Sequence, residues 1–298
     1  MKIGLFVWWG TLKGGGGLTY LKNLIECFNN NQIEYEIQHW DKKTEPQFSD
    51  VDAVVCLSTG TISRRKATQD LEKAWLDYLC NNWDTYAIVH SERYFTLYPL
   101  LDYFEQKAEI LSVSRSLAKE RNWKFIGIPI DKLLNEAKPL RFSSDDKITA
   151  ISTARPKRMK DPKWVEQVAM KITNRFYSRF KAEGMITHGY PLEPFENAKE
   201  VFYKYKPMIL IEGMGSKIEN DLNMHQYSVL EAMAYGLVPV VKPNTEGDFK
   251  HRHNVCVDGD DWAEMICDID LVYSHNIKLL KTNKYYDVSA SLKTILGR

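Results

Sequence analysis

The apolar residues of the chain form short runs that alternate with stretches of helical periodicity. The runs with the length and composition of buried strands are residues 3–9, 34–40, 53–57, 86–89, 109–113, 147–152, 184–188, 208–211 and 238–241. Between these runs, apolar residues recur at the spacing of amphipathic helices, as they do in residues 18–25. This alternation predicts an α/β protein with parallel sheets and crossover helices.

One polar segment divides the predicted strands into two groups. Residues 138–147 are mostly polar, contain a proline and lead directly into a new strand, which is typical of a linker between domains. We therefore predict two Rossmann-like domains, an N-terminal one at residues 1–140 and a C-terminal one at residues 146–298.

The composition is that of a globular protein. The chain has 298 residues, of which 44% are hydrophobic, enough for two domains with substantial cores. Its five cysteines lack the spacing of a zinc site or a disulfide framework, which indicates reduced thiols. No run approaches a membrane-spanning length, and the N-terminal run lacks a cleavage pattern, so we expect a cytoplasmic protein that does not bind membranes. The net charge of +1 argues against wholesale coating of nucleic acid.

The segment from residue 223 to residue 241 is the most informative part of the chain. Its apolar residues have helical spacing, Gly236 supplies a left-handed stop, and the buried strand 238–241 follows at once. Glu231 lies inside this apolar helix. A buried carboxylate is costly unless it is paired, and two ligand hydroxyls, such as those of a ribose, would satisfy both of its oxygens. The simpler alternative is a Glu that reaches solvent from the helix face.

A glycine-rich turn follows the first predicted strand. Gly16 and Gly17 end a run of four glycines and begin an amphipathic helix. Glycines at such a turn let backbone N–H groups approach an anion at the helix N-terminus, although a flexible turn needs the same residues. The run lacks the G-x-G-x-x-G spacing of a dinucleotide-binding oxidoreductase.

A basic segment follows the strand at 147–152. Arg155 and Lys160 belong to it, and a guanidinium and an ammonium can stabilise the charge on a leaving nucleoside diphosphate without a metal. A solvated basic loop is the alternative, but open sheets bind ligands at the carboxyl ends of their strands. The acidic segment 258–261 suggests a metal site at first sight. We predict none, because its last aspartates directly precede a helix and Asp is the expected cap there.

These segments together resemble one enzyme family. Residues 230–241, Leu-Glu-Ala-Met-Ala-Tyr-Gly-Leu-Val-Pro-Val-Val, closely resemble the nucleotide-sugar-binding signature of the retaining, family 4-like GT-B glycosyltransferases. The resemblance covers nearly the whole chain. It implies a GT-B fold, in which two Rossmann-like domains face each other across a cleft and the last helix packs back on the first domain. It also implies transfer of a hexose or pentose from a nucleotide sugar, with UDP as the expected nucleotide, with retained configuration and without metal or cofactor.

The resemblance assigns roles to individual residues. Glu231 matches the residue that holds the donor ribose, whereas Asn223 stands where the family carries a first Glu, which leaves the contact to the donor sugar open. The implied catalytic residues are His90, Arg155 and Lys160. The implied donor-binding residues are Gly16, Gly17, Arg155, Lys160, Gly189, Tyr190, Asn223, Tyr227, Ser228 and Glu231, with Gly189 and Tyr190 at the base after the strand predicted at 184–188.

The acceptor is less constrained. The glycine-rich turn, residues 54–61 and residues 242–247 are similar to those of the family members that attach sugar to hydroxymethylated pyrimidines in bacteriophage DNA. Arg64, Arg65 and Lys66 would then bind phosphates beside a flipped base. Two alternatives stay open: transfer to a glycan or lipid-linked sugar, and a non-catalytic nucleotide-sugar binder, which Asn223 would suit. The sequence leaves the oligomeric state open.

Overall fold

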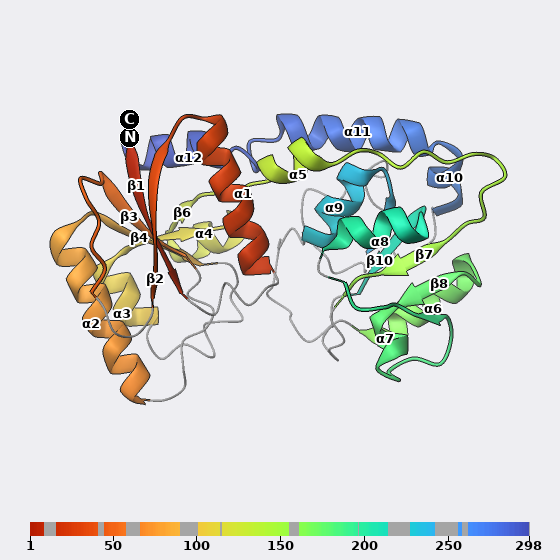
Figure 1. Ribbon diagram of the computed structural model, residues 1–298, viewed down its shortest axis with the longest axis horizontal. Helices are drawn as coiled ribbons and strands as arrows, with labels where there is room; N and C mark the ends of the chain where they lie inside the picture. Colours follow the sequence, from red (N-terminus) through yellow and green to blue (C-terminus); the bar gives the residue numbers. More distant parts are fainter. Residues whose placement is uncertain are drawn as a thin grey trace. The chain divides into compact units, whose positions relative to one another are not determined.

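The computed structural model divides into two α/β units (Figure 1). The structure describes residues 1–8, 16–40, 45–57, 66–89, 101–113, 115–154, 161–195, 197–213, 227–241, 256–257 and 262–297. Among these, unit 1 contains Met1–Lys132 and the residues from Asn283 on, and unit 2 contains those between Leu133 and Thr282. The segment predicted as the linker, 138–147, lies in unit 2, where the Leu140 amide donates a hydrogen bond to the Tyr235 carbonyl at 2.9 Å.

Unit 1 is built on a six-stranded parallel sheet with the order β2-β1-β3-β4-β5-β6. Its strands are β1 (Lys2–Trp8), β2 (Glu34–Trp40), β3 (Ala53–Leu57), β4 (Thr85–Val89), β5 (Glu109–Ser112) and β6 (Lys124–Phe125). Its helices are α1 (Gly16–Asn30), α2 (Lys66–Asn82), α3 (Leu101–Lys107), α4 (Arg115–Arg121) and α12 (Val288–Ile295), and α5 (Asp131–Glu136) begins in it. The strand order reverses between β1 and β3, which places the switch point of this sheet there.

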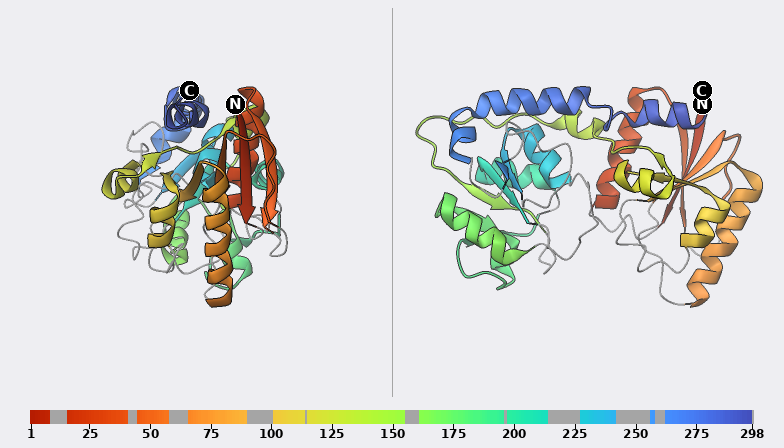
Figure 2. Two further views of the ribbon diagram at one scale, coloured as in Figure 1. Left: turned by 90° about the vertical axis from the view of Figure 1, so that its left-hand side faces the viewer. Right: turned by 180° about the vertical axis from the view of Figure 1, so that it is seen from behind.

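Helices cover both faces of the unit 1 sheet. On one face, alternate strand residues such as Phe6, Val54 and Ala87 pack against Leu76 of α2 and Phe104 of α3. Figures 1 and 2 show α1 on the opposite face. The alternation of buried side chains across the strands is what gives each face its own apolar layer.

The C-terminal segment is part of unit 1. The Ser289 hydroxyl donates to Asn31 Oδ1 at 3.1 Å, which ties α12 to the end of α1. The Ile128 amide donates to the Tyr285 carbonyl at 3.1 Å, and the Tyr285 hydroxyl donates to the Val113 carbonyl. Gly127 has a φ of +88°, and a Cβ there would lie 2.2 Å from the Tyr285 carbonyl oxygen, so only glycine fits.

Unit 2 has a second six-stranded parallel sheet, with the order β12-β11-β10-β7-β8-β9. Its strands are β7 (Ala150–Ser152), β8 (Phe176–Ser178), β9 (Tyr190–Pro191), β10 (Ile209–Glu212), β11 (Val238–Val241) and β12 (Cys256–Val257). Its helices are α6 (Pro162–Ile172), α7 (Arg179–Ala182), α8 (Ala198–Tyr205), α9 (Tyr227–Tyr235), α10 (Trp262–Cys267) and α11 (Ile269–Thr282). The prediction of an α/β protein with two parallel sheets is therefore confirmed.

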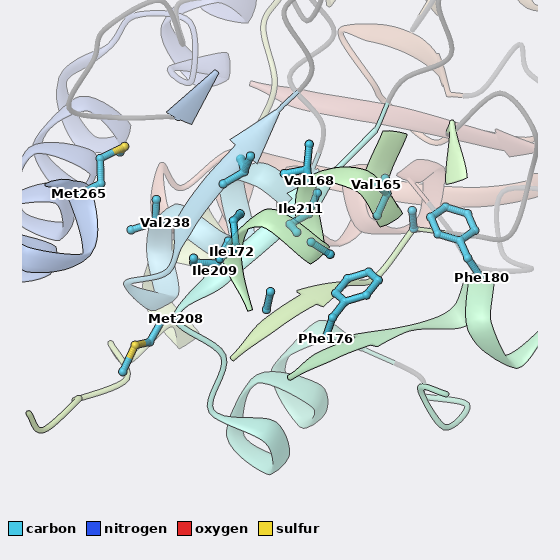
Figure 3. Close-up of a cluster of buried hydrophobic side chains, with 14 of the residues drawn as sticks. Val165, Val168, Ile172, Phe176, Phe180, Met208, Ile209, Ile211, Val238 and Met265 are labelled. Carbon is cyan, nitrogen blue, oxygen red and sulfur yellow. The ribbon is translucent and has the colours of Figure 1, made fainter. Parts of the chain in front are cut away.

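One apolar core cluster of unit 2 lies between its sheet and α6, with Met265 of α10 and Val272 of α11 beside them. Figure 3 shows side chains of α6, including Val165 and Val168, gathered with Ile209 and Ile211 of β10 and with Phe176 of β8. These side chains are at most 2% exposed. No helix within the described ranges has the length and hydropathy that a membrane span requires.

One predicted strand of unit 2 is wrong. Residues 184–188 form no strand, and the edge of the sheet is instead made by β8 and β9. This short segment begins at Gly184 and ends just before Gly189, and both glycines have left-handed backbones, with φ of +68° and +83°. Ile186 is 4% exposed and packs in the core from a loop, so burial alone produced the apolar pattern.

Candidate functional site

The strand order of unit 2 reverses between β7 and β10. Ligands of open α/β sheets bind at such a switch point, outside the carboxyl ends of the strands. The two strands end in Ser152 and Glu212, which are 0% and 1% exposed. Within the described residues, the Ser152 hydroxyl has no hydrogen-bond partner. Buried polar groups at these two strand ends make the switch point of unit 2 the first candidate for a ligand site.

Glu212 contacts the helix that starts beside it. The Ser228 hydroxyl donates to Glu212 Oε2 at 3.2 Å, and Ser228 is the second residue of α9. A carboxylate at a helix N-terminus also interacts favourably with the helix dipole. The sequence analysis missed Glu212, although an acidic residue that directly follows the apolar run 208–211 was the available sign of it.

Glu231 lies one turn after Ser228 on α9. The residues around it are buried, namely Val229, Leu230, Ala232, Met233, Ala234 and Tyr235. Glu231 itself is half-buried, and burial raises the pKa of its carboxyl to about 7. No other described residue forms a hydrogen bond with this carboxyl. A carboxyl in this state is suited to accept hydrogen bonds from a ligand, because those bonds would replace the water that it has lost.

A glycine fixes the end of α9. Gly236 has a φ of +82°, and the buried strand β11 starts two residues later. The observed helix, glycine and strand match the order predicted from residues 223–241, so the local pattern places Glu231 on a rigid element.

The β9 edge of the described sheet carries a row of aromatic rings. The ring of Tyr190 in β9 stacks on that of Tyr177 in β8, with centroids 5.3 Å apart, and Tyr177 lies 4.6 Å from Tyr205 of α8. Tyr190 is 51% exposed. Before it, Gly189 has no room for a side chain, since a Cβ would lie 2.7 Å from the Phe176 carbonyl oxygen.

The loop that leads to Tyr190 is held by one carboxylate. Glu166 Oε1 on α6 accepts from the amides of Thr187 and His188, both at 2.6 Å, and lies 3.0 Å from His188 Nδ1. Burial raises the pKa of Glu166, but the hydrogen bonds from His188 and Thr187 outweigh it and lower the pKa below its usual range. The Lys181 ammonium donates to the Thr187 carbonyl from α7.

Comparison with solved structures identifies the architecture. An alpha-glucosyltransferase in complex with UDP and a 13-mer DNA containing a HMU base is similar over 100% of both chains, with a TM-score of 0.68 and 15% identity. The chain has the GT-B fold. Anabaena Alr3699/HepE in complex with UDP-glucose is similar over 100% of both chains, with a TM-score of 0.62 and 9% identity. AviGT4, a glycosyltransferase involved in avilamycin A biosynthesis, matches with a TM-score of 0.61 and 12% identity, over 99% of this chain and 96% of its own.

Sequence comparison adds no closer relative. No protein-family model matches the sequence, and no curated protein matches it. The GT-B fold expected from residues 230–241 is thus confirmed by structural similarity.

The structure describes about half of the predicted site residues. Tyr227, Ser228 and Glu231 lie together on α9, which starts beside the end of β10. Gly189 and Tyr190 lie three strands away, at the sheet edge; Tyr190 begins β9 and does not follow the strand that was predicted at 184–188. Gly16 and Gly17 are the first residues of α1 in unit 1. Lys66 is the first residue of α2, and its side chain lies outside the described part of the structure. The residues outside the described ranges are Arg64, Arg65, His90, Arg155, Lys160 and Asn223.

The described residues hold no cluster of three or more metal-ligating side chains. The acidic segment 258–261, for which we predicted no metal role, lies outside the described ranges.

Proposed function

We propose that the protein is a retaining glycosyltransferase that uses a UDP-sugar as donor. The observation that carries this proposal is the Glu231 carboxyl, which is half-buried on α9, has a pKa raised to about 7 and has no hydrogen-bond partner among the described residues. A ribose diol would donate to both of its oxygens. The GT-B fold supports the proposal, since two proteins that share it were solved with UDP or UDP-glucose.

The donor would lie along the carboxyl ends of the unit 2 strands. In this proposal Tyr227 and Ser228 line the start of α9 next to the ribose, and Gly189 with Tyr190 contacts the base. Arg155 and Lys160, which follow β7 in the sequence, neutralise the diphosphate. The remaining contacts of the proposal are those of Gly16 and Gly17 to the phosphates, through amides at the start of α1, and of His90 and Asn223 to the donor sugar.

The proposed transfer retains the configuration of the sugar. The bond between the anomeric carbon and the phosphate oxygen breaks, and the acceptor oxygen bonds to the same face of that carbon. The leaving phosphate takes the proton of the acceptor hydroxyl. Arg155 and Lys160 would stabilise the charge on the departing UDP, so the proposal requires neither a metal nor a further cofactor. Activity that a chelator abolishes and magnesium restores would contradict it, as would a product of inverted configuration.

The proposed acceptor is a hydroxymethylpyrimidine in DNA. The support is the similarity over the full chain to the alpha-glucosyltransferase bound to UDP and HMU-containing DNA. A base hydroxyl inside a duplex cannot easily meet a sugar donor bound at the carboxyl ends of the sheet, so the nucleotide would be flipped out, with flanking phosphates bound by Arg64, Arg65 and Lys66. The test is to incubate the protein with nucleotide sugars and with hydroxymethylated or plain duplex DNA, then digest the DNA to nucleosides for mass analysis.

Two results would redirect the proposal. Transfer to a glycan with no modification of any DNA would favour the glycan-modifying alternative. UDP binding with neither transfer nor donor hydrolysis would favour a non-catalytic binder. For the DNA contact itself, replacing Arg64, Arg65 and Lys66 by Ala should raise the KM for DNA and flatten its salt dependence while leaving UDP affinity unchanged.

A further inference from the structure

Glu212 is a buried carboxylate that the proposed reaction does not use directly. It is 1% exposed at the end of β10, at the switch point of the unit 2 sheet. A carboxylate so deeply buried is retained only when specific hydrogen bonds compensate for its lost hydration. One such bond is visible, from the Ser228 hydroxyl to Glu212 Oε2 at 3.2 Å.

Ser228 connects Glu212 to the proposed donor site. Ser228 and Glu231 are three residues apart in α9 and therefore lie on the same side of the helix. The hydrogen bond of Ser228 fixes the first turn of α9 against the end of β10. The position of this first turn also sets the position of Glu231, because a helix of this length behaves as one rigid element.

We infer that Glu212 is a positioning residue of the nucleotide site, which holds α9 through Ser228 so that Glu231 meets the ligand. This inference rests on the proposed function. In it, Glu212 does not touch the ligand, and its contribution to binding passes through the Ser228 hydroxyl. Burial is the only cause that raises the pKa of Glu231, so a displaced α9 would also change the ionisation of that carboxyl.

The test is a double-mutant cycle on UDP affinity, measured by calorimetry with the full chain. Glu212→Ala and Ser228→Ala should each weaken UDP binding about fivefold, and the double variant should also bind about fivefold more weakly than the parent. Glu212→Gln, whose amide oxygen can still accept from Ser228, should bind within about twofold of the parent. The Glu212→Gln variant remains informative if Glu212→Ala folds poorly.

A second measurement separates positioning from general stability. UDP affinity should titrate with a midpoint set by Glu231, and that midpoint should fall toward the ordinary range of Glu in Glu212→Ala and Ser228→Ala. Ser178→Ala is the control, since it also removes a serine hydroxyl with a hydrogen bond in unit 2, one that accepts from the Phe180 amide at 3.0 Å. It should lower the melting temperature and leave both the affinity and the midpoint unchanged.

Each outcome decides the inference. Multiplying effects in the double variant, or a midpoint that stays at the parent value, would overturn it. If Glu231→Ala weakens UDP binding and Glu212→Ala does not, the inference fails while the proposed function stands. If the parent binds none of UDP, GDP, ADP, CDP and dTDP, the proposed function fails and takes the inference with it.

Discussion

The two units share a scaffold but differ in chemistry at corresponding points. Each has a six-stranded parallel sheet whose strand order reverses once, between β1 and β3 in unit 1 and between β7 and β10 in unit 2. In unit 1 the last register pair of the corresponding strands is Val7 and Leu57, which are apolar and 0% and 2% exposed, and β1 ends one residue later at Trp8. In unit 2 the corresponding strands end in the buried polar residues Ser152 and Glu212. The fold itself therefore does not require polar strand ends.

The difference shows one place where this chain tolerates unfavourable burial. Unit 1 has others away from its strand ends: the buried Trp75 indole N–H, which has no partner in the described structure, and Asp131, whose pKa is raised by burial. A serine hydroxyl with no partner in the described structure and a carboxyl with a raised pKa both reduce stability, and in unit 2 both lie on elements that end or start at the switch point. Such costs are typical of ligand sites, where bound ligand supplies the missing partners. In unit 1 the tightest constraint is a packing one, the approach of Gly127 to the Tyr285 carbonyl.

The largest effect should come from the packing constraint in unit 1. Gly127→Ala would place a Cβ 2.2 Å from the Tyr285 carbonyl oxygen in a left-handed backbone, which forces the C-terminal segment to move. We expect a loss of about 3 kcal/mol in the free energy of unfolding, measured by denaturant titration. Gly184→Ala in unit 2 is the control, since it has a similar φ of +68° and open space around its Cβ. It should cost about 1 kcal/mol, and equal losses in the two variants would contradict the clash.

The next effect concerns the candidate ligand site in unit 2. Glu231→Ala should weaken UDP binding by roughly 1.5–3 kcal/mol, because two ribose hydroxyls would lose their acceptor. It should not lower the stability of the free protein, because the carboxyl has no hydrogen-bond partner among the described residues. Glu183→Ala, which removes an exposed carboxylate after α7, is the control for charge. Unchanged UDP affinity of Glu231→Ala in calorimetry would remove the ribose assignment.

The sequence predicts the local features of both units and misses contacts between distant segments. Residues 34–40, 53–57 and 238–241 are strands with the predicted bounds, since apolar periodicity is a local property. The wrong strand at 184–188 arose because Ile186 is buried from a loop that Glu166 holds, 21 residues away from Thr187. Neighbouring residues carry no sign of such a contact.

The same limit applies to the site. Glu231 could be singled out as a candidate because its helix, glycine and strand are consecutive in the sequence. Glu212 was missed because its partner Ser228 is 16 residues away, and the two residues come together only in the folded unit. A buried carboxylate at a strand end becomes visible as a site residue only after the sheet order is known.

The pH dependence of UDP binding sharpens the contrast further. The folded-state pKa of Glu231 is about 7, above the ordinary value of 4.5, so between these values the folded state binds more protons than the unfolded state. Stability of the free protein should therefore fall as pH rises from 4.5 to 7. UDP affinity should increase about tenfold from about pH 6 to about pH 8, because the ionised carboxyl accepts from both hydroxyls. A Glu231→Gln variant should lose this dependence, and an unchanged slope in that variant would assign the titration to another group.

The smallest effect should come from the two serines that pair across β7 and β8. Ser152 and Ser178 are register partners, and both are 0% exposed. Only the Ser178 hydroxyl has a visible role: it caps the N-terminus of α7 by accepting a hydrogen bond from the Phe180 amide. Ser152→Ala removes a buried hydroxyl without a partner in the described part of the chain, so the free energy of unfolding should rise by about 1 kcal/mol. Ser178→Ala removes a satisfied cap and should lower it by a similar amount, about 1 kcal/mol. If Ser152→Ala instead destabilises the free protein, its hydroxyl is already bound within the fold, and the polar end of β7 ceases to distinguish unit 2 from unit 1.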